Sequence, residues 1–153
     1  MIVVSDTSVI TSLIHIGRLT LLQELHGTVL IPRAVHRELL RTHESLPAFL
    51  EIRDATNHEM VARLTAELDA GEAEAIVLCK ELKADLLLID EKLGRQIALR
   101  EGVPIAGLIA LVIEAKQRGL ISSVRKIVGQ LEKDAGFRVS EMVKLEAFEK
   151  AGE

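Results

Sequence analysis

Short runs rich in Val, Ile and Leu alternate along this chain with longer segments of helical periodicity. Residues 2–5, 28–31, 86–89 and 103–105 have the composition of short buried strands, and residues 51–55 indicate a weaker edge strand. Most of these runs lead into a helical segment. This order of elements is typical of a parallel sheet covered by helices, which predicts an α/β fold.

The helical segments follow from apolar spacing, capping residues and glycines. Residues 6–8 cap a first helix that Gly17 ends, and a chain of 153 residues with 48% hydrophobic content suits one domain over 1–153. Its part 121–153 is a helical C-terminal extension, in which Met142, Leu145 and Phe148 can pack on the domain or on a partner. Further helices are expected over 19–25, 33–41, 57–68 and 72–83, through 95–99, over 107–116 and 122–134, and at the end of 137–150.

Composition limits how the chain can bind nucleic acid. Three Phe and no Tyr or Trp exclude aromatic base stacking as the main contact, and the formal net charge is −4. Arg33, Arg37 and Arg41 nevertheless recur at every fourth position, along one side of a helix. This arginine stripe either holds a phosphate backbone or is a solvated face that pairs with nearby acids.

The sequence predicts a cytoplasmic protein with no membrane partner. Its start has no basic segment before the apolar run, and the apolar stretch 105–113 is too short to span a bilayer. The single Cys79 cannot form an internal disulfide, which suits a reducing compartment. We expect Cys79 to be a buried, inert residue.

Two acids directly follow predicted strands. Asp6 comes after 2–5 and Asp90 after 86–89. In an open parallel sheet, ligands bind at the carboxyl ends of the strands, so these acids are candidates for a shared site. For each of them alone, a helix N-cap is an equally ordinary role.

Glu38 is expected on the face of its helix that meets the core, beside Ala34, Val35 and Leu39. Burying an unpaired carboxylate costs several kcal/mol, so Glu38 needs either a metal ion or a basic partner. The arginines of the same helix are the alternative partners.

The helix that begins near Gly71 carries Glu72 and Glu74. At about 100° per residue, Glu72 lies about 40° from Ile76 and Glu74 about 160° from it. We therefore expect Glu72 to face the core, where the helix dipole favours an anion, and Glu74 to face water. Glu74 and Glu81 are interpreted as residues that aid solubility.

Four carboxylates from separate segments form a set of hard oxygen ligands, which suits Mg²⁺ or Mn²⁺. Such ions activate water and neutralise charge on a phosphoryl group.

Four motifs carry a family resemblance: Val4-Ser-Asp6-Thr-Ser8, Val35-His-Arg-Glu38-Leu39, Gly71-Glu72-Ala-Glu-Ala-Ile76, and Leu87-Leu-Ile-Asp90-Glu91 through Gly94-Arg95. Over residues 1–115 the chain resembles the PIN domains of VapC-type toxin ribonucleases. The resemblance implies a three-layer α/β/α sandwich with a parallel sheet and metal-dependent cleavage of RNA. It also implies a homodimer and a small antitoxin protein as partner.

By that resemblance, the acidic catalytic positions are Asp6, Glu38, Glu72 and Asp90. Metal binding is expected from Asp6, Glu72 and Asp90, and substrate binding from Arg33, Arg37, Arg41 and Arg95.

Two departures from the family pattern leave alternatives open. The third acid is usually Asp and here is Glu72, and Glu91 could replace Asp90 as the inward ligand. A zinc or histidine-based site lacks paired ligand spacings, and a phosphatase lacks a glycine-rich phosphate loop. A PIN-like protein that binds RNA or a protein without catalysis remains the alternative of a different class.

Overall fold

The computed structural model describes all residues from 1 to 153. Its sheet has five strands in the order β3-β2-β1-β4-β5, and every neighbouring pair is parallel. Val4 in the central strand pairs with Leu30 on one side and with Leu87 on the other. The predicted parallel sheet is confirmed. The strands are β1 (Val3–Ser5), β2 (Val29–Ile31), β3 (Leu50–Ile52), β4 (Leu86–Leu88) and β5 (Ile105–Ala106).

The strand order reverses at β1. The chain passes from β1 to β2 and β3 on one side, and returns on the other side as β4 and β5. Such a reversal opens a crevice between two neighbouring strands at their carboxyl ends, where α/β proteins bind their ligands. Ser5 and Leu88 face each other at that end, so the residues that follow them enter the crevice.

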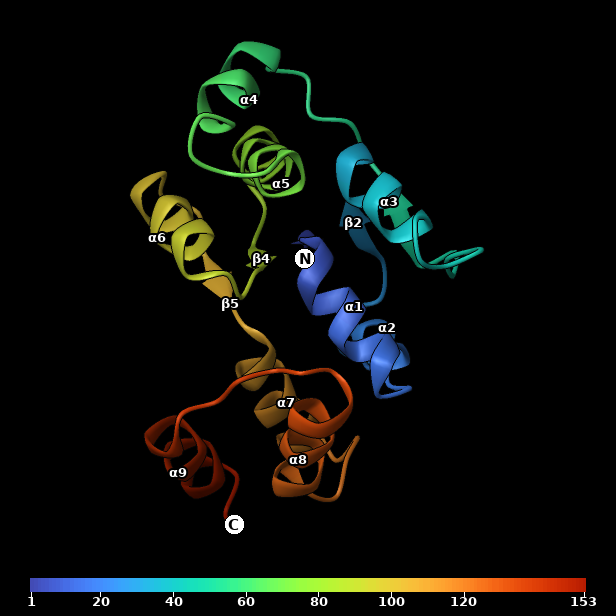
Figure 1. Cartoon of the computed structure of the whole chain (residues 1–153), viewed down its shortest axis with the longest axis vertical. Coiled ribbons are helices and arrows are strands. Elements are labelled where there is room, and N and C mark those ends of the chain that lie inside the picture. Colours follow the sequence, from blue (N-terminus) through green and yellow to red (C-terminus); the bar gives the residue numbers. More distant parts are fainter.

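Nine helices cover the sheet, and Figure 1 shows their arrangement. The chain passes through α4, α5 and α6 at one end of this view and finishes with α7, α8 and α9 at the other. None of the helices combines the length and the apolar character needed to cross a membrane. The helices are α1 (Thr7–His15), α2 (Thr20–His26), α3 (Arg33–Leu40), α4 (His58–Leu64), α5 (Ala70–Leu82), α6 (Lys92–Arg100), α7 (Leu108–Gln117), α8 (Val124–Asp134) and α9 (Glu141–Lys150).

Two hydrophobic cores lie on opposite faces of the sheet. Val3 and Leu88 point into the core beneath α1, α2, α7, α8 and α9, whereas Val4 and Leu87 point into the core beneath α4, α5 and α6. Alternate strand residues therefore serve different cores, as expected for a sheet covered on both faces. The three-layer α/β/α sandwich is confirmed.

Several element boundaries differ from the prediction: the edge strand expected over 51–55 lies at Leu50–Ile52, and the helix expected through 95–99 begins at Lys92. The helix expected over 57–68 ends at Leu64 and continues as turns. The last strand lies at Ile105–Ala106 instead of 103–105, because Pro104 has no N–H to donate and only its carbonyl joins the ladder, accepting from the amide of Leu87 at 2.8 Å.

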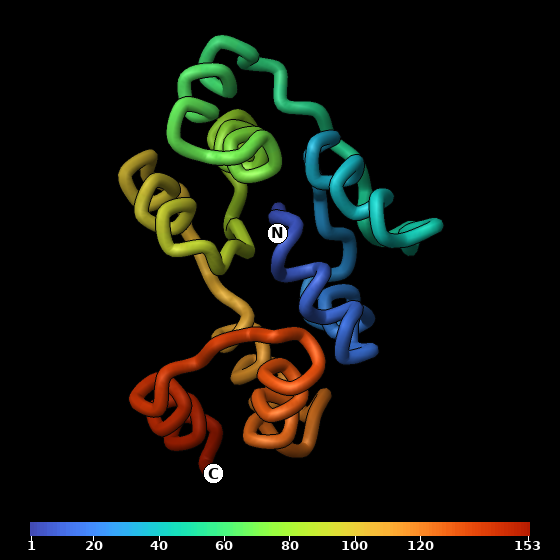
Figure 2. The backbone as a smooth tube through the Cα atoms, in the orientation of Figure 1, coloured from blue at the N-terminus to red at the C-terminus, as the bar shows by residue number.

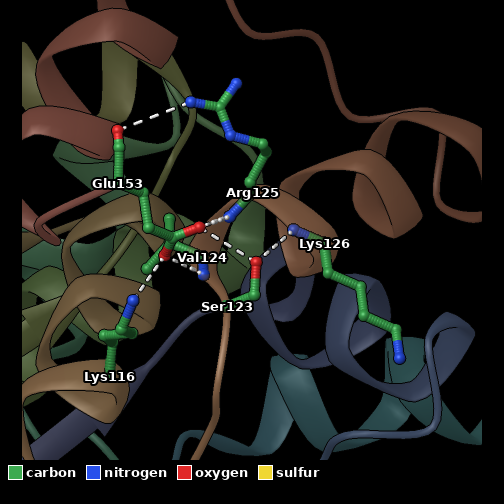
Figure 3. A network of polar contacts seen from close by, with 6 residues as sticks. All are labelled: Lys116, Ser123, Val124, Arg125, Lys126 and Glu153. Carbon is green, nitrogen blue, oxygen red and sulfur yellow. Dashed lines mark hydrogen bonds and ion pairs between the residues drawn. The ribbon is translucent and has the colours of Figure 1, made fainter.

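Glu153, the last residue, bonds to both α7 and the start of α8, as Figure 3 shows. The Glu153 carboxylate accepts the amides of Val124 and Arg125 at 2.6 and 3.1 Å and the Ser123 hydroxyl at 2.9 Å, at the start of α8. It also forms an ion pair of 2.9 Å with Lys116 at the end of α7. One side chain therefore joins the C-terminus to two preceding helices.

The apolar side chains expected to pack from α9 behave differently from one another. Phe148 is buried in the core shared with α7 and α8, but Met142 and Leu145 are 72% and 67% exposed. A spacing of three residues drifts around a helix, so only one of the three reaches the core.

Candidate active site

A polar pocket of about 350 Å³ lies where α1, α5 and α6 begin, at the carboxyl ends of β1 and β4. No hydrophobic residue lines it. Four carboxylates and four hydroxyl groups form its surface instead, which is the ligand chemistry of hard cations. The lining residues are Asp6, Thr7, Ser8, Thr11, Ser12, Asp69, Glu72 and Glu91.

Asp6 is the most deeply buried acid of the site, with 2% of its surface exposed. Its carboxylate caps α1, accepting the Val9 amide at 3.2 Å and the Ser8 hydroxyl at 3.0 Å. Burial raises the pKa of Asp6 to about 7, and the negative charges of Asp90 and Glu72 add to the rise, while the two hydrogen bonds oppose it. Asp6 therefore does cap α1, but the hydrogen bonds of the cap stabilise the charged carboxylate less than the loss of hydration destabilises it.

Glu72 lies in the first turn of α5, behind Asp69, whose side chain caps that helix by accepting the Glu72 amide at 2.8 Å. Burial raises the pKa of Glu72 to about 7, and the charges of Asp69 and Glu91 contribute. Two acids of the pocket therefore hold protons near neutral pH when no cation is present.

Asp90 lies beside the pocket instead of lining it. Its two carboxylate oxygens accept the Leu108 amide at 3.1 and 3.2 Å, which caps α7. Burial raises the pKa of Asp90, against the lowering effect of the Leu108 amide and Arg95. Of the two neighbouring acids in this motif, Asp90 is half-buried and acts electrostatically on Asp6, whereas Glu91 is exposed and lines the pocket.

Glu38 reaches the site through a hydroxyl group. It is half-buried on α3 and accepts the Thr7 hydroxyl at 2.7 Å, and Thr7 lines the pocket. The alternative that Arg37 or Arg41 neutralises Glu38 is wrong, since neither arginine forms an ion pair with it.

Three glycines leave the space that these carboxylates occupy. A Cβ atom at Gly71 would lie 3.0 Å from Oε1 of Glu38, and one at Gly94 would lie 2.7 Å from Oε2 of Glu72. A Cβ at Gly107 would lie 2.5 Å from Oδ1 of Asp90. None of the three glycines has a positive φ, so close approach is the reason for glycine here.

The donor chemistry of the pocket fits Mg²⁺ or Mn²⁺, because every side chain that lines it offers oxygen. The raised pKa values of Asp6 and Glu72 show that burial disfavours their charged forms. A bound divalent cation stabilises the charged carboxylates and so offsets this effect. No three acidic, histidine or cysteine side chains are gathered closely enough to hold one ion as they stand. Binding of one ion by three of these carboxylates at once therefore requires the side chains to approach one another.

Two acids interpreted as solubility residues have structural contacts. Glu74 is half-buried and accepts the Ala34 amide of α3 at 3.2 Å, so the expectation that it faces water is wrong. Glu81 accepts the Thr56 and Asn57 amides at 2.9 and 2.6 Å. The angular position of Glu74 on α5 did not predict its exposure, because this helix is buried on nearly all sides, including the side that α3 covers. Cys79 on the same helix is buried, as predicted, and burial raises the pKa of its thiol to about 12.

The arginines do not form one uniform surface. Arg33 makes a bidentate ion pair with Asp54, with distances of 2.9 and 3.3 Å. Both residues line another polar pocket, which Arg37 also lines. Arg41 is exposed just after the end of α3. Arg95 donates to the Ile89 carbonyl at 3.1 Å and lies beside the candidate site.

Sequence reasoning missed three residues that line the pocket, Asp69, Thr11 and Ser12, whereas Glu91, which also lines it, was the open alternative to Asp90. Asp69 had a local signal, because an N-cap Asp three residues before a Glu is a capping pattern that places both at a helix start. Thr11 and Ser12 continue the polar face of α1 that begins at Ser8. No local signal indicates that this face turns toward α5.

Comparison with known proteins agrees with this architecture. The profile of the DUF3368 family, described as a PIN domain, matches residues 2–153. No curated protein matches the chain. The match includes the C-terminal helices, which the resemblance over residues 1–115 did not cover. Since the profile spans nearly the whole chain and the fold is a nuclease-type α/β/α sandwich, the protein belongs to the DUF3368 family of PIN-domain proteins.

Proposed function

We propose that this protein is a metal-dependent endoribonuclease that hydrolyses RNA phosphodiester bonds with Mg²⁺ or Mn²⁺. The observation that carries the proposal is the group of carboxylates at the carboxyl ends of β1 and β4, none of which forms an ion pair. A protein gains nothing in stability from burying acids that repel one another. A bound cation would offset the repulsion between these carboxylates.

In this proposal Asp6, Glu72 and Asp90 would hold the metal ion, which would supply an activated water molecule and neutralise charge on the phosphate. Glu38 orients the Thr7 hydroxyl at the edge of the pocket through their 2.7 Å hydrogen bond. The Ser8 hydroxyl and the Val9 amide orient the Asp6 carboxylate, and the Leu108 amide orients that of Asp90.

The substrate-binding role of Arg33, Arg37, Arg41 and Arg95 remains part of the proposal. Arg37 and Arg41 form no ion pair and are free for phosphate, whereas Arg33 must exchange Asp54 for the substrate. From the resemblance to VapC-type toxins we further propose a toxin that acts in the cytoplasm as a homodimer and is neutralised by a small antitoxin, whereas the family match supports the PIN domain alone. A short neighbouring gene with a DNA-binding pattern would support that role, and its absence would favour a nuclease outside a toxin-antitoxin pair.

The alternative is a PIN-domain protein that binds RNA or a protein without cutting. The observation in its favour is that no three metal-ligating side chains are gathered in this structure. The two functions differ in one measurable respect, the appearance of metal-dependent products.

The test is the chemistry of the cleaved ends. Metal-activated water leaves 5′-phosphate and 3′-hydroxyl ends, whereas a histidine-based nuclease uses the 2′-hydroxyl, needs no metal and leaves a 2′,3′-cyclic phosphate. We expect EDTA to abolish cleavage, Mg²⁺ or Mn²⁺ to restore it, and Ca²⁺ to restore it poorly. Mass spectrometry of a cleaved oligonucleotide identifies the ends.

Asp6→Asn protein, purified in parallel, is the control for contaminating nucleases. A cyclic phosphate formed in EDTA contradicts the carboxylate mechanism. Equal cleavage by the wild type and Asp6→Asn, or none by either with Mn²⁺ present, favours the non-catalytic alternative.

A further inference from the structure

A second hollow of about 310 Å³ lies next to the carboxylate pocket, on the far side of Asp90. The start of α7, the segment between α8 and α9, and α9 itself form its walls. Figure 2 shows that segment running past the start of α7. We call this hollow the flanking pocket, and the residues used below are Asp90, Arg95, Ile109, Phe137, Arg138 and Val143.

The flanking pocket carries two guanidinium groups that form no ion pair, although Asp90 lines the same pocket and lies near Arg95. Arg95 is held by its hydrogen bond to the Ile89 carbonyl, and Arg138 is exposed on the segment between α8 and α9. Neither forms an ion pair, although the chain has an excess of acids. Free guanidinium groups in a hollow are suited to phosphate oxygens, which they bind through paired hydrogen bonds.

The rest of the pocket surface is apolar. Half of its ten lining residues are hydrophobic, and Ile109, Phe137 and Val143 remain partly accessible. A nucleotide joins a flat, weakly polar base to an anionic phosphate. The apolar lining suits the base, and the guanidinium groups of Arg95 and Arg138 suit the phosphate. The volume is at the lower end of the range for small-ligand sites, which suits one nucleotide better than a longer segment.

We propose that the flanking pocket binds the ribonucleotide next to the scissile phosphate of a single-stranded RNA. Its phosphate meets the two arginines and its base lies on the apolar surface. The inference rests on the proposed function, because Asp90 lines the flanking pocket and the next residue, Glu91, lines the carboxylate pocket, so an RNA strand bound at the carboxylates can extend into the flanking pocket. The C-terminal helices thereby take part in choosing where the RNA is cut.

The first test measures binding without cleavage. A short fluorescent single-stranded RNA of mixed sequence is titrated in EDTA at several salt concentrations, with fluorescence anisotropy as readout. We expect Arg138→Ala to weaken binding and to reduce the slope of log affinity against log salt by about one, the effect of one lost phosphate contact. Arg53→Ala is the matched control, since Arg53 is exposed beyond β3 at the opposite edge of the sheet.

The second test reads the cut sites by sequencing the products of a mixed-sequence RNA. Val143→Asp places a negative charge on the apolar surface, at a side chain that is 41% exposed and so tolerates change. We expect the nucleotide preference beside the cut to change in Val143→Asp and in Arg138→Ala, and to stay unchanged in Arg53→Ala.

The outcomes separate the two proposals. Cleavage with an unchanged salt slope and unchanged cut sites in Arg138→Ala overturns the flanking pocket and leaves the nuclease standing. Binding that depends on Arg138 in a protein that never cleaves supports the flanking pocket and overturns the nuclease. A pocket that serves a protein partner leaves RNA binding by Arg138→Ala equal to that of the wild type, which also overturns the inference.

Discussion

The Asp6 carboxyl group gives the clearest prediction at the scale of a single residue. Its folded-state pKa of about 7 lies above the model value of 3.8, so the folded protein binds this proton more tightly than the unfolded chain does. The resulting stability is present below the unfolded pKa and is lost as pH rises through about 7. Without metal, we expect the free energy of unfolding to fall by a few kcal/mol between about pH 4 and pH 7, the interval between the two pKa values.

Urea unfolding in EDTA across this pH range measures the effect. Asp6→Asn removes the titrating group and should flatten the dependence without abolishing it, because the pKa of Glu72 is also about 7. The variant should lose cleavage by at least about tenfold while keeping its fold. A wild-type stability that rises with pH in EDTA contradicts this account of the site.

The glycine beneath Glu72 offers a second test at this scale. Gly94→Ala places a methyl group within 2.7 Å of both Glu72 Oε2 and Ile89 Cδ1. We expect a loss of about 1–3 kcal/mol in stability, as for other overpacked sites, and a marked loss of Mn²⁺-dependent cleavage because the carboxylate is displaced.

Gly129→Ala is the matched control within a helix. Nothing lies within 4 Å of a Cβ at Gly129, which is exposed on α8 without a positive φ. Alanine there should stabilise the protein by about 0.5–1 kcal/mol and leave cleavage unchanged. Equal effects of the two substitutions indicate that the space at Gly94 is not what positions Glu72.

At the scale of elements, two helices begin without a side-chain cap of their own and receive one from elsewhere. After Pro32, α3 takes its cap at Ala34 from Glu74, and after Gly107, α7 takes its cap at Leu108 from Asp90. The four amides at a helix start need acceptors, so these long-range caps hold the starts of α3 and α7 at the carboxyl ends of the strands that precede them.

Glu72 and Glu74 of α5 therefore have separable effects. Glu74→Ala should cost about 1 kcal/mol of stability through the lost cap and leave cleavage almost unchanged. Glu72→Gln should abolish cleavage and keep or raise stability in EDTA. Chemical denaturation and a cleavage assay at fixed Mn²⁺ compare both. If Glu74→Ala is the more damaging change for cleavage while folding is intact, the site must be rebuilt around Glu74.

At the scale of the whole molecule, Glu153 closes the C-terminal layer onto α7 and α8. Burial opposes the charge of Glu153, but the bonds from Lys116, Val124, Arg125 and Ser123 prevail and lower its pKa from 4.5 to about 2. A depressed folded-state pKa contributes stability above the unfolded pKa, and this contribution is lost as pH falls through about 2.

We expect Glu153→Ala to lower the free energy of unfolding at pH 7 by about 1–3 kcal/mol, and to speed hydrogen exchange in α9 and in the first turn of α8. Glu149→Ala, an exposed acid of α9, is the control and should stay within about 0.5 kcal/mol of the wild type. Unchanged exchange in α9 after Glu153→Ala means that Phe148 and its apolar neighbours hold the helix by themselves.

The order of strands and helices, the parallel sheet and the positions of Asp6 and Asp90 after their strands could all be predicted from the sequence. These features depend on local periodicity and on which residues end each element, both of which neighbouring residues determine. Glu38 was also predictable as a half-buried acid, because the apolar face of α3 is well defined by Val35 and Leu39.

What the tertiary structure decided is which side chains meet across elements. Helical phase cannot place Glu74 on a helix buried nearly all round, and no pattern in the sequence connects Asp69 and Glu91 to one pocket or Arg138 to the neighbourhood of Asp90. The three glycines under the carboxylates are likewise ordinary in sequence. Their necessity comes from backbones brought within contact distance by packing, and contact between distant segments is a property of the folded chain alone.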